Sequence, residues 1–349
     1  MQLKLTQSSR TIPQSISTSS QTRRGKLNTV LVLGRGRSGT TWIAQMMNTH
    51  ADCSYKHEPF LRTKSTDYNT WLQEIESGDV DRLRERYEEI CRRAYHGVDM
   101  PPFPPKSFRT QNGKLLHLLY SVGNRIKWVQ SLYESYGKVP LTEQTPVLIK
   151  DVNFPNQRLL RLCEVIEPSV LAVIRNPFAN IASYLKGVEL SLFENCQQAK
   201  VESVRQILQK PEGQQFSQYL DRLDDLSLAQ IEALLWRMSA EPLVEFVRSY
   251  DRGLVVVYED VCLDPHAQIA KMFDFVGWEV GQSTRDFIDR SISGEKSSSD
   301  SGKAYYSVYR DPRQSMSKWK TQLTHEQVAD IASVIRESPL TDLWSDLPL

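Results

Sequence analysis

Short apolar runs alternate with longer amphipathic segments along most of this chain. The runs at residues 28–33, 146–150, 169–174 and 253–258 are continuous and rich in β-branched residues, which is typical of strands buried on both faces. Apolar residues at helical spacing predict helices at residues 40–48, 79–96, 155–166, 177–186, 227–250, 263–277 and 324–337. Strands that alternate with helices predict an α/β fold, in which helices cover both faces of a central parallel sheet.

Several local features refine these helices. The segment 79–96 places one apolar face toward the core, made of Val80, Leu83, Tyr87, Ile90, Cys91 and Ala94. Pro177 suits the first turn of the helix at 177–186, and Pro242 predicts a kink within 227–250.

The same pattern predicts the domain organisation. Residues 28–349 form a single α/β domain, with residues 59–145 and 188–226 as mostly helical cap insertions. Residues 1–27 are rich in Ser, Thr and Gln and contain neither an acidic residue nor an apolar run, which predicts a disordered tail, with a plastid transit peptide as the alternative. The polar stretch 293–303 is either a lid or a linker.

Composition excludes some classes of partner. The chain has 349 residues and a formal net charge of +1, so nothing overall indicates a nucleic-acid partner. No apolar run is long enough to span a bilayer. The five cysteines are scattered without a C-x-x-C pair, which argues against a disulfide framework or a zinc site and favours the cytoplasm. The sequence leaves the oligomeric state open.

One stretch carries most of the chemistry, "VLVLGRGRSGTTW" at residues 30–42. It follows a strand and precedes a helix, as the phosphate-binding P-loop G-x-x-x-x-G-K-[ST] does, but Thr40 stands where that motif has lysine. Backbone N–H groups of such a turn bind anions, and Arg35 and Arg37 add positive charge. An ordinary tight turn between a strand and a helix is the alternative. Without the lysine, a nucleotide with one 5′-phosphate suits the loop better than a Mg²⁺–triphosphate.

The stretch "GRGRSGTTW" resembles the 5′-phosphosulfate loop of sulfotransferases that use 3′-phosphoadenosine 5′-phosphosulfate (PAPS). The resemblance implies a three-layer P-loop-type fold and no metal. It implies that Arg37 contacts the 5′-phosphate and the bridging oxygen of the leaving group. Trp42 would stack on adenine, with a core aromatic as the alternative. The implied phosphate loop consists of Arg35, Gly36, Arg37, Ser38, Gly39, Thr40 and Thr41.

Two further stretches resemble the parts of this family that bind the 3′-phosphate. In "VLAVIRNPFANIASYLKG", Arg175 ends a strand and Ser183 lies on the next helix, so a bidentate guanidinium and a hydroxyl would meet the phosphate. A strand-end salt bridge and an exposed serine are the alternatives. In "RDPRQSMSKWKTQLT", Trp319 and Lys320 match the Trp-Lys pair of the family's nucleotide loop, and Arg313 is a third candidate phosphate contact. A plain surface loop is the alternative there.

Transfer to an acceptor hydroxyl also requires a base. Cytosolic small-molecule members place a His two residues after a strand-end Lys, but "VLIKDVNFP" has Lys150 followed by Val152. Carbohydrate and bacterial members use a Glu soon after the P-loop helix, and "SYKHEPF" resembles that segment. We therefore expect Glu58 to be the base, with His57 second and a solvated loop as the alternative. Lys150 would neutralise the transferring group, or have no role.

Together these motifs predict a sulfotransferase that moves a sulfuryl group from PAPS in line to a hydroxyl or amino group and releases PAP. The acceptor would be a carbohydrate or a small-molecule natural product. Aromatic residues of the cap either stack on it or form the core of the cap: Trp71, Tyr120, Trp128, Tyr133 and Tyr136. A P-loop kinase and a non-catalytic nucleotide-binding protein are the competing hypotheses.

Overall fold

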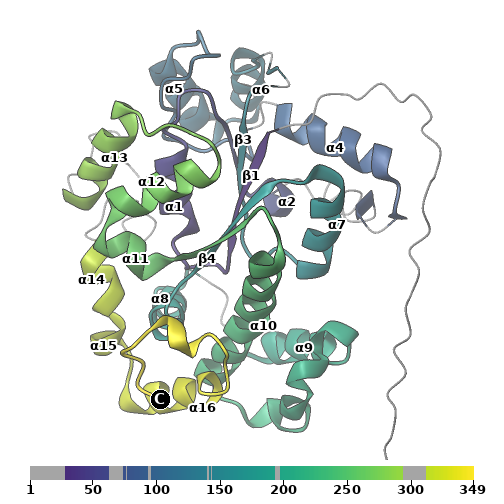
Figure 1. Cartoon of the computed structure of the whole chain (residues 1–349), viewed down its shortest axis with the longest axis vertical. Coiled ribbons are helices and arrows are strands. Elements are labelled where there is room, and N and C mark those ends of the chain that lie inside the picture. The colour runs from purple at the N-terminus through teal and green to yellow at the C-terminus, as the bar shows by residue number, and fades with distance from the viewer. Residues whose placement is uncertain are drawn as a thin grey trace, which may run out of the picture.

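The computed structural model describes residues 28–62, 74–75, 77–92, 96–139, 141–142, 144–192, 197–293 and 312–349. The tail at 1–27, Trp71 and most of the stretch 293–303 lie outside these ranges. A parallel sheet occupies the centre, in the strand order β2-β3-β1-β4-β5 (Figure 1). Its strands are β1 (Thr29–Gly34), β2 (Ser54–His57), β3 (Val147–Lys150), β4 (Ser169–Ile174) and β5 (Gly253–Val257).

Helices cover the sheet on both faces, as the pattern predicts. They are α1 (Thr40–Met47), α2 (Pro59–Arg62), α4 (Val80–Arg92), α5 (Gly113–Gly123), α6 (Lys127–Tyr136), α7 (Asn156–Ile166), α8 (Pro177–Glu189), α9 (Gln197–Leu208), α10 (Leu228–Ser249), α11 (Tyr258–Leu263), α12 (Pro265–Phe275), α13 (Gln282–Ser293), α14 (Pro312–Ser317), α15 (Trp319–Gln322) and α16 (His325–Ile335). Two 3₁₀ helices, η1 (Pro211–Asp225) and η3 (Thr341–Leu343), complete the described elements.

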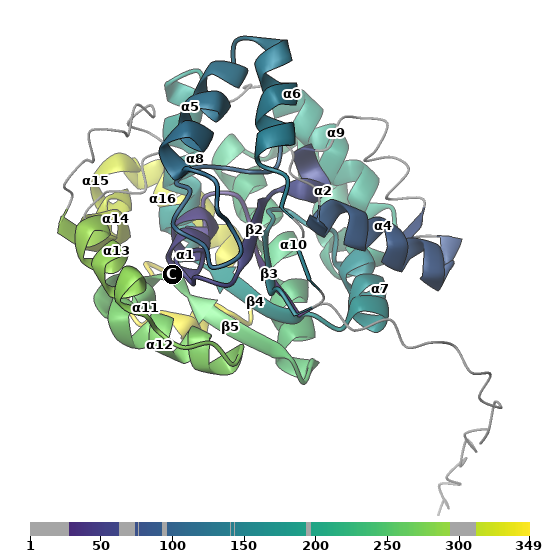
Figure 2. The ribbon, with the colours of Figure 1, turned by 90° about the horizontal axis from the view of Figure 1, so that it is seen from above.

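Alternate residues of β1, β3, β4 and β5 enter two separate cores. On β1, Val30 and Val32 pack with residues of α1, α11, α12 and α13. Leu31 and Leu33 pack on the opposite face with residues of α4, α7, α8, α10 and α16. Figure 2 shows α11, α12 and α13 on one side of the strands and α4 and α7 on the other. Because both faces are covered, the strands β1, β3, β4 and β5 consist mainly of apolar residues, and the helices on both faces confirm the three-layer α/β prediction.

Three details differ from or extend the sequence expectation. The strand β2 was not predicted, because its sequence Ser-Tyr-Lys-His has no apolar run. On α4, Leu83, Tyr87 and Cys91 are buried as expected, but Val80 is 39% exposed because it begins the helix beyond the edge of the core. The helix α10 continues through Pro242 to Ser249.

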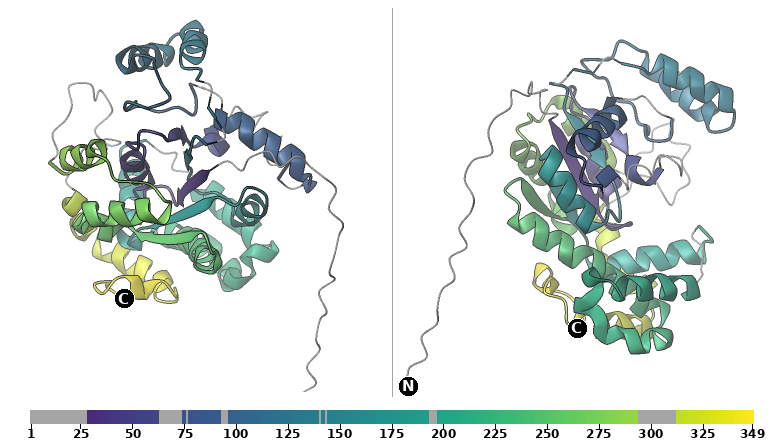
Figure 3. Two further views of the ribbon diagram at one scale, coloured as in Figure 1. Left: turned by 45° about the horizontal axis from the view of Figure 1, so that its top comes forward. Right: turned by 90° about the vertical axis from the view of Figure 1, so that its right-hand side faces the viewer.

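The cap between β2 and β3 includes a helical hairpin formed by α5 and α6, which stands at the edge of the molecule (Figure 3). Tyr120 and Tyr133 lie with their ring centroids 5.7 Å apart, and both rings contact Phe103. His96 stacks on Tyr120 at 4.5 Å. These aromatic residues form a small core of the cap, whereas Trp128 is 69% exposed.

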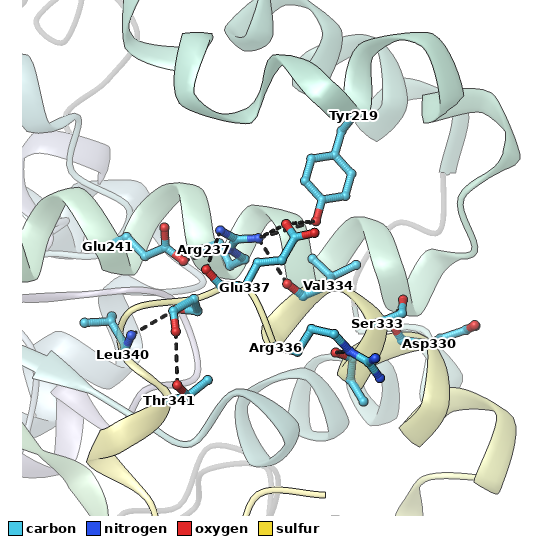
Figure 4. A network of polar contacts seen from close by, with 12 residues as sticks. Tyr219, Arg237, Glu241, Asp330, Ser333, Val334, Arg336, Glu337, Leu340 and Thr341 are labelled. Atoms are coloured by element: carbon cyan, nitrogen blue, oxygen red, sulfur yellow. Dashed lines mark hydrogen bonds and ion pairs between the residues drawn. The ribbon is translucent and has the colours of Figure 1, made fainter. Parts of the chain in front are cut away.

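Arg237 ties the C-terminal helix to the body of the fold (Figure 4). Its Nε donates to Glu241 at 2.7 Å, and its Nη1 donates to Glu337 at 2.9 Å and to the carbonyl of Val334 at 3.1 Å. Tyr219 of η1 donates to the same Glu337 carboxylate at 3.0 Å. Arg237 is 5% exposed, and its buried guanidinium is tolerated because carboxylates and carbonyls accept its hydrogen bonds. The network fixes α10, whose other turns reach the site described next.

Candidate active site

The carboxyl ends of all the strands meet at one edge of the sheet, and the predicted residues gather there. The phosphate loop at residues 35–39 follows β1, and Glu58 follows β2. Lys150 ends β3, Arg175 follows β4, and Tyr258 follows β5. This is the edge at which open α/β sheets bind ligands, because the strand-to-helix loops and the helix N-termini converge there.

The phosphate loop has a constrained backbone. Arg37 adopts a φ of 72° and Gly39 a φ of 87°, both in the left-handed region. A Cβ on Gly39 would lie 2.2 Å from the ring of Tyr258, so only glycine fits this position without displacement. Ser38 donates its backbone N–H to the carbonyl of Arg35 at 3.1 Å, and α1 begins at Thr40. The turn therefore delivers the first N–H groups of α1 to the edge of the sheet.

Two asparagines that sequence reasoning missed hold this loop. Asn153 accepts a hydrogen bond from the N–H of Gly36 at 3.1 Å. Asn180, fully buried on α8, donates to the carbonyl of Gly36 and to the hydroxyl of Ser38, each at 3.1 Å. Asn180 lies inside the stretch that carries Arg175 and Ser183, but its role depends on a contact about 140 residues away in the chain. The spacing within the motif gives no signal of that contact.

The structure joins the two predicted phosphate motifs. Arg175 donates from Nη1 to the carbonyl of Arg37 at 2.9 Å, and Arg37 donates from Nε to the hydroxyl of Ser183 at 3.1 Å. The Arg175 guanidinium lies over the Tyr258 ring, 4.8 Å from its centroid, and also donates to the carbonyl of Ser315 at 2.7 Å. Among the described residues, its buried Nε–H has no hydrogen-bond acceptor. The observed hydrogen-bond partners of Arg175 are thus carbonyls, and among the described residues its Nε–H has none.

Glu58 and Lys150 form a buried ion pair at the ends of β2 and β3. Glu58 has a φ of 51° and donates its backbone N–H to the carbonyl of Lys150 at 2.6 Å. His57 contacts the Tyr55 hydroxyl through Nδ1 at 2.7 Å, and its Nε2 lies 3.6 Å from the Glu58 carboxylate. The solvated-loop alternative is wrong, because Glu58 is 8% exposed and His57 is 3% exposed.

Asp151 is a second carboxyl group at this point, and sequence reasoning missed it. It is 1% exposed, and its two oxygens accept the N–H groups of Val152 at 2.8 Å and Phe60 at 3.1 Å. Burial raises the pKa of Asp151 to about 7, the two N–H donors oppose this, and the negative charge of Glu58 adds to it. Asp151 thereby ties β3 to the turn that follows Glu58.

Arg35 of the phosphate loop and Trp42 of α1 have other partners than expected. Arg35 forms an ion pair with Glu232 of α10 and donates to its carbonyl at 2.8 Å. Glu232 is 1% exposed and also pairs with Lys200, so a buried carboxylate accounts for the charge of Arg35. Trp42 is buried, donates its indole N–H to Ser291 at 3.1 Å and meets Tyr258 edge-on. These contacts support the core alternative for Trp42 over adenine stacking.

The C-terminal candidates lie on two short helices, α14 and α15, rather than in a surface loop. Trp319 is buried, with its ring 5.1 Å from that of Phe178 on α8. Lys320 pairs with Asp346 at 3.2 Å. Arg313 is exposed on α14, near the carbonyl of Ser315 that Arg175 contacts. The Trp-Lys pair therefore anchors α15 to α8 and to the C-terminal segment.

The described residues contain neither a metal-binding cluster nor a helix suited to crossing a membrane. Across these ranges, no group of three or more His, Cys, Asp or Glu side chains is arranged to hold a metal ion. None of the helices in the same ranges combines the length and apolarity needed to cross a membrane.

Comparisons with known proteins agree with the geometry. The sulfotransferase domain model matches residues 27–339. Carbohydrate sulfotransferase 1 of Danio rerio is 21% identical over 345 residues, covering 90% of this chain and 77% of that protein. Its Mus musculus counterpart is 22% identical over 330 residues, covering 86% and 75%. The sulfotransferase domain of the Synechococcus PCC 7002 olefin synthase aligns with a TM-score of 0.46 at 14% identity, covering 95% of this chain and 100% of that one. The chain therefore belongs to the sulfotransferase domain family and is a PAPS-dependent sulfotransferase.

Proposed function

We propose that this enzyme transfers the sulfuryl group of PAPS to a hydroxyl or amino group of a carbohydrate or another small molecule and releases PAP. One observation carries the proposal. The loop expected to hold the 5′-phosphosulfate and the arginine expected to hold the 3′-phosphate are 138 residues apart in the chain, yet Arg175 Nη1 lies 2.9 Å from the carbonyl of Arg37. The names of the curated relatives favour a carbohydrate acceptor.

The donor would be held by groups that already converge. Arg37, the hydroxyls of Ser38, Thr40 and Thr41, and the N-terminus of α1 suit the 5′-phosphosulfate. Arg175 and Ser183 suit the 3′-phosphate, and the Nε–H of Arg175, which has no acceptor among the described residues, is a donor that such an anion would satisfy. Arg313 on the adjacent α14 is the remaining candidate contact.

Glu58 would act as the general base. In the transfer, the acceptor O–H bond breaks and its proton passes to the Glu58 carboxylate, while the acceptor oxygen bonds to sulfur and the bond from sulfur to the leaving phosphate oxygen breaks. Lys150, which contacts Glu58, and Arg37 would offset the charge that develops on the leaving oxygen. Glu58 suits the role better than His57 because its side chain is 11% exposed against 3% for His57.

The cap would form the acceptor side. Residues 59–145 follow directly on Glu58, and residues 188–226 follow α8, which carries Ser183. An acceptor bound between these insertions would have Glu58 at its reacting hydroxyl. The cytoplasm is the compartment we propose, since the described cysteines Cys53, Cys91, Cys163 and Cys262 form no disulfide with one another.

Titration calorimetry tests the donor site. Wild type, Arg175→Ala and the control Arg252→Ala would each be titrated with PAP and with ATP–Mg²⁺. Arg252 lies at the start of β5, on the opposite edge of the sheet, so its loss removes the same charge far from the site. We expect PAP to bind wild type and the control alike, and Arg175→Ala at least tenfold more weakly. Binding of ATP–Mg²⁺ without binding of PAP would contradict the proposal and favour the kinase hypothesis.

Turnover separates the base from the donor site. Glu58→Gln keeps the shape of the side chain, so we expect PAP affinity within about twofold of wild type and turnover reduced by roughly 100-fold or more. His57→Gln should retain more activity than Glu58→Gln. The opposite order would assign the base to His57, and equal loss of turnover and PAP affinity in Glu58→Gln would make Glu58 a structural residue.

A further inference from the structure

The large apolar side chains that remain exposed concentrate on the α5–α6 hairpin. Half of the large hydrophobic residues exposed in the described structure lie there, including Leu118 at 57% and Trp128 at 69% exposed. We define the hairpin surface as Leu115, Leu118, Ile126, Trp128 and Leu132. Exposed apolar residues scattered singly need no explanation, but a group on one protruding hairpin marks an interaction site.

Helical geometry shows that this surface is separate from the core of the cap. On α5, Leu116 and Gly123 are buried, whereas Leu115 and Leu118 lie one turn apart on the outer face. On α6, Val129 and Tyr133 are buried, whereas Trp128 and Leu132 form an outward pair four residues apart. Each helix therefore has two apolar faces, and only one face of each helix packs against the rest of the protein.

The charge around the hairpin surface has one sign. Residues 106–139 contain six Lys or Arg residues and a single acid, Glu134, whereas the whole chain has a net charge of only +1. Lys114, Arg125, Lys127 and Lys138 are exposed. Glu134 is half-buried, and its carboxylate accepts the N–H of His96 at 3.3 Å. The apolar side chains thus stand among cations.

We propose that the α5–α6 hairpin docks this enzyme on an anionic lipid surface. Leucine, isoleucine and tryptophan side chains would enter the boundary between headgroups and acyl chains, while the lysines and arginines meet anionic headgroups. Charge favours this partner over a second copy of the chain, because a symmetric contact would bring the four exposed cations of each hairpin toward those of the other. The hairpin stands at the edge of the molecule, so it can contact a surface without covering the sheet (Figure 3).

Vesicle co-sedimentation of the full chain tests this inference. Vesicles of phosphatidylcholine alone would be compared with vesicles that also contain phosphatidylserine, at low and high salt. We expect binding to the anionic vesicles, weakened by salt. The double variant Trp128→Ser/Leu132→Ser should bind about tenfold more weakly. The control Leu160→Ser/Leu263→Ser removes leucines that are 48% and 57% exposed on α7 and α11 and should bind as wild type does.

A third variant isolates the charge. Arg125→Gln/Lys127→Gln should bind anionic vesicles more weakly and with a smaller salt dependence. Circular dichroism of each variant checks that the fold is intact, which exposed positions should allow. Absence of vesicle binding by wild type, or equal binding by the Trp128→Ser/Leu132→Ser variant and its control, would overturn the proposal. A dimer in sedimentation velocity that the same variant dissociates would assign the hairpin surface to a second copy instead.

Discussion

The carboxyl group of Asp151 should make this fold less stable as pH rises toward neutrality. Burial raises the pKa of Asp151 from 3.8 to about 7, because a charged carboxylate at 1% exposure loses its hydration. Between these two pH values the folded chain binds a proton that the unfolded chain releases. This contribution to stability is therefore complete below the pKa of Asp151 in the unfolded chain, and it is lost as pH rises through its pKa in the folded chain.

The magnitude follows from the same two values. A difference between 3.8 and about 7 corresponds to roughly 4 kcal/mol of unfolding free energy, at about 1.4 kcal/mol per pH unit. Roughly 3 kcal/mol of it should be lost between pH 5 and pH 8. Asp151→Asn abolishes the titration. It also presents an amide N–H₂ to one of the two N–H donors at this site, which lowers stability by an amount that does not depend on pH.

Urea unfolding of wild type and Asp151→Asn at pH 5, 6, 7 and 8 measures the effect. The quantity of interest is the wild-type stability minus the variant stability, which should shrink by roughly 3 kcal/mol across this range. Asp225→Asn, at an exposed position of η1, controls for the loss of any carboxylate. In a Glu58→Gln background the fall should be smaller, because the charge of Glu58 helps to raise the pKa of Asp151. A difference that stays constant from pH 5 to pH 8 would refute the argument.

Further predictions concern the phosphate loop. Gly39→Ala places a Cβ against the Tyr258 ring at a φ of 87°, so it should lower the unfolding temperature and reduce PAP affinity more than tenfold in calorimetry. Asn180→Ala removes two hydrogen bonds to the loop, so PAP affinity should fall about tenfold; unchanged affinity would show that the loop holds its shape without them. Arg35→Met leaves Glu232 with one cationic partner fewer and should destabilise the fold by about 3 kcal/mol in urea unfolding. A larger effect on PAP affinity than on stability would instead restore Arg35 as a phosphate contact.

The sheet was largely predictable because its strands are buried on both faces. Burial on both faces requires continuous apolar runs, and β4 appears at residues 169–174, as that rule predicts. The strand β2 does not follow this rule. It is the outermost strand on one side of the sheet, and its polar side chains form specific contacts: Lys56 pairs with Asp99, and His57 contacts Tyr55. The pair of Lys56 and Asp99 joins residues 43 apart in the chain, and no local pattern of apolar residues predicts it.

The sequence predicted which residues lie at the candidate site, but not which residues they contact. The P-loop motif and the resemblance to the family located Gly39 and Arg175, and Arg175 does lie at the loop. The partner of Arg35 lies 197 residues away on α10, so local sequence could not show that this arginine neutralises a buried carboxylate. Asp151 was missed for the opposite reason. It adjoins Lys150 in sequence, but its burial and its contact with the N–H of Phe60 appear only in the folded chain.

The distribution of these arginines explains how a P-loop can lack its lysine. Arg35 is paired with Glu232, whereas Arg37 from the loop and Arg175, which follows β4, contact each other where the strands end. These two are not independent, because Arg175 donates to the carbonyl of Arg37, whose side chain in turn donates to Ser183. Arg175, the residue predicted to bind the 3′-phosphate, thereby helps to hold Arg37 at its positive φ. In the function we propose, an anion at Arg175 would therefore also act on the backbone of the loop that holds the sulfuryl donor.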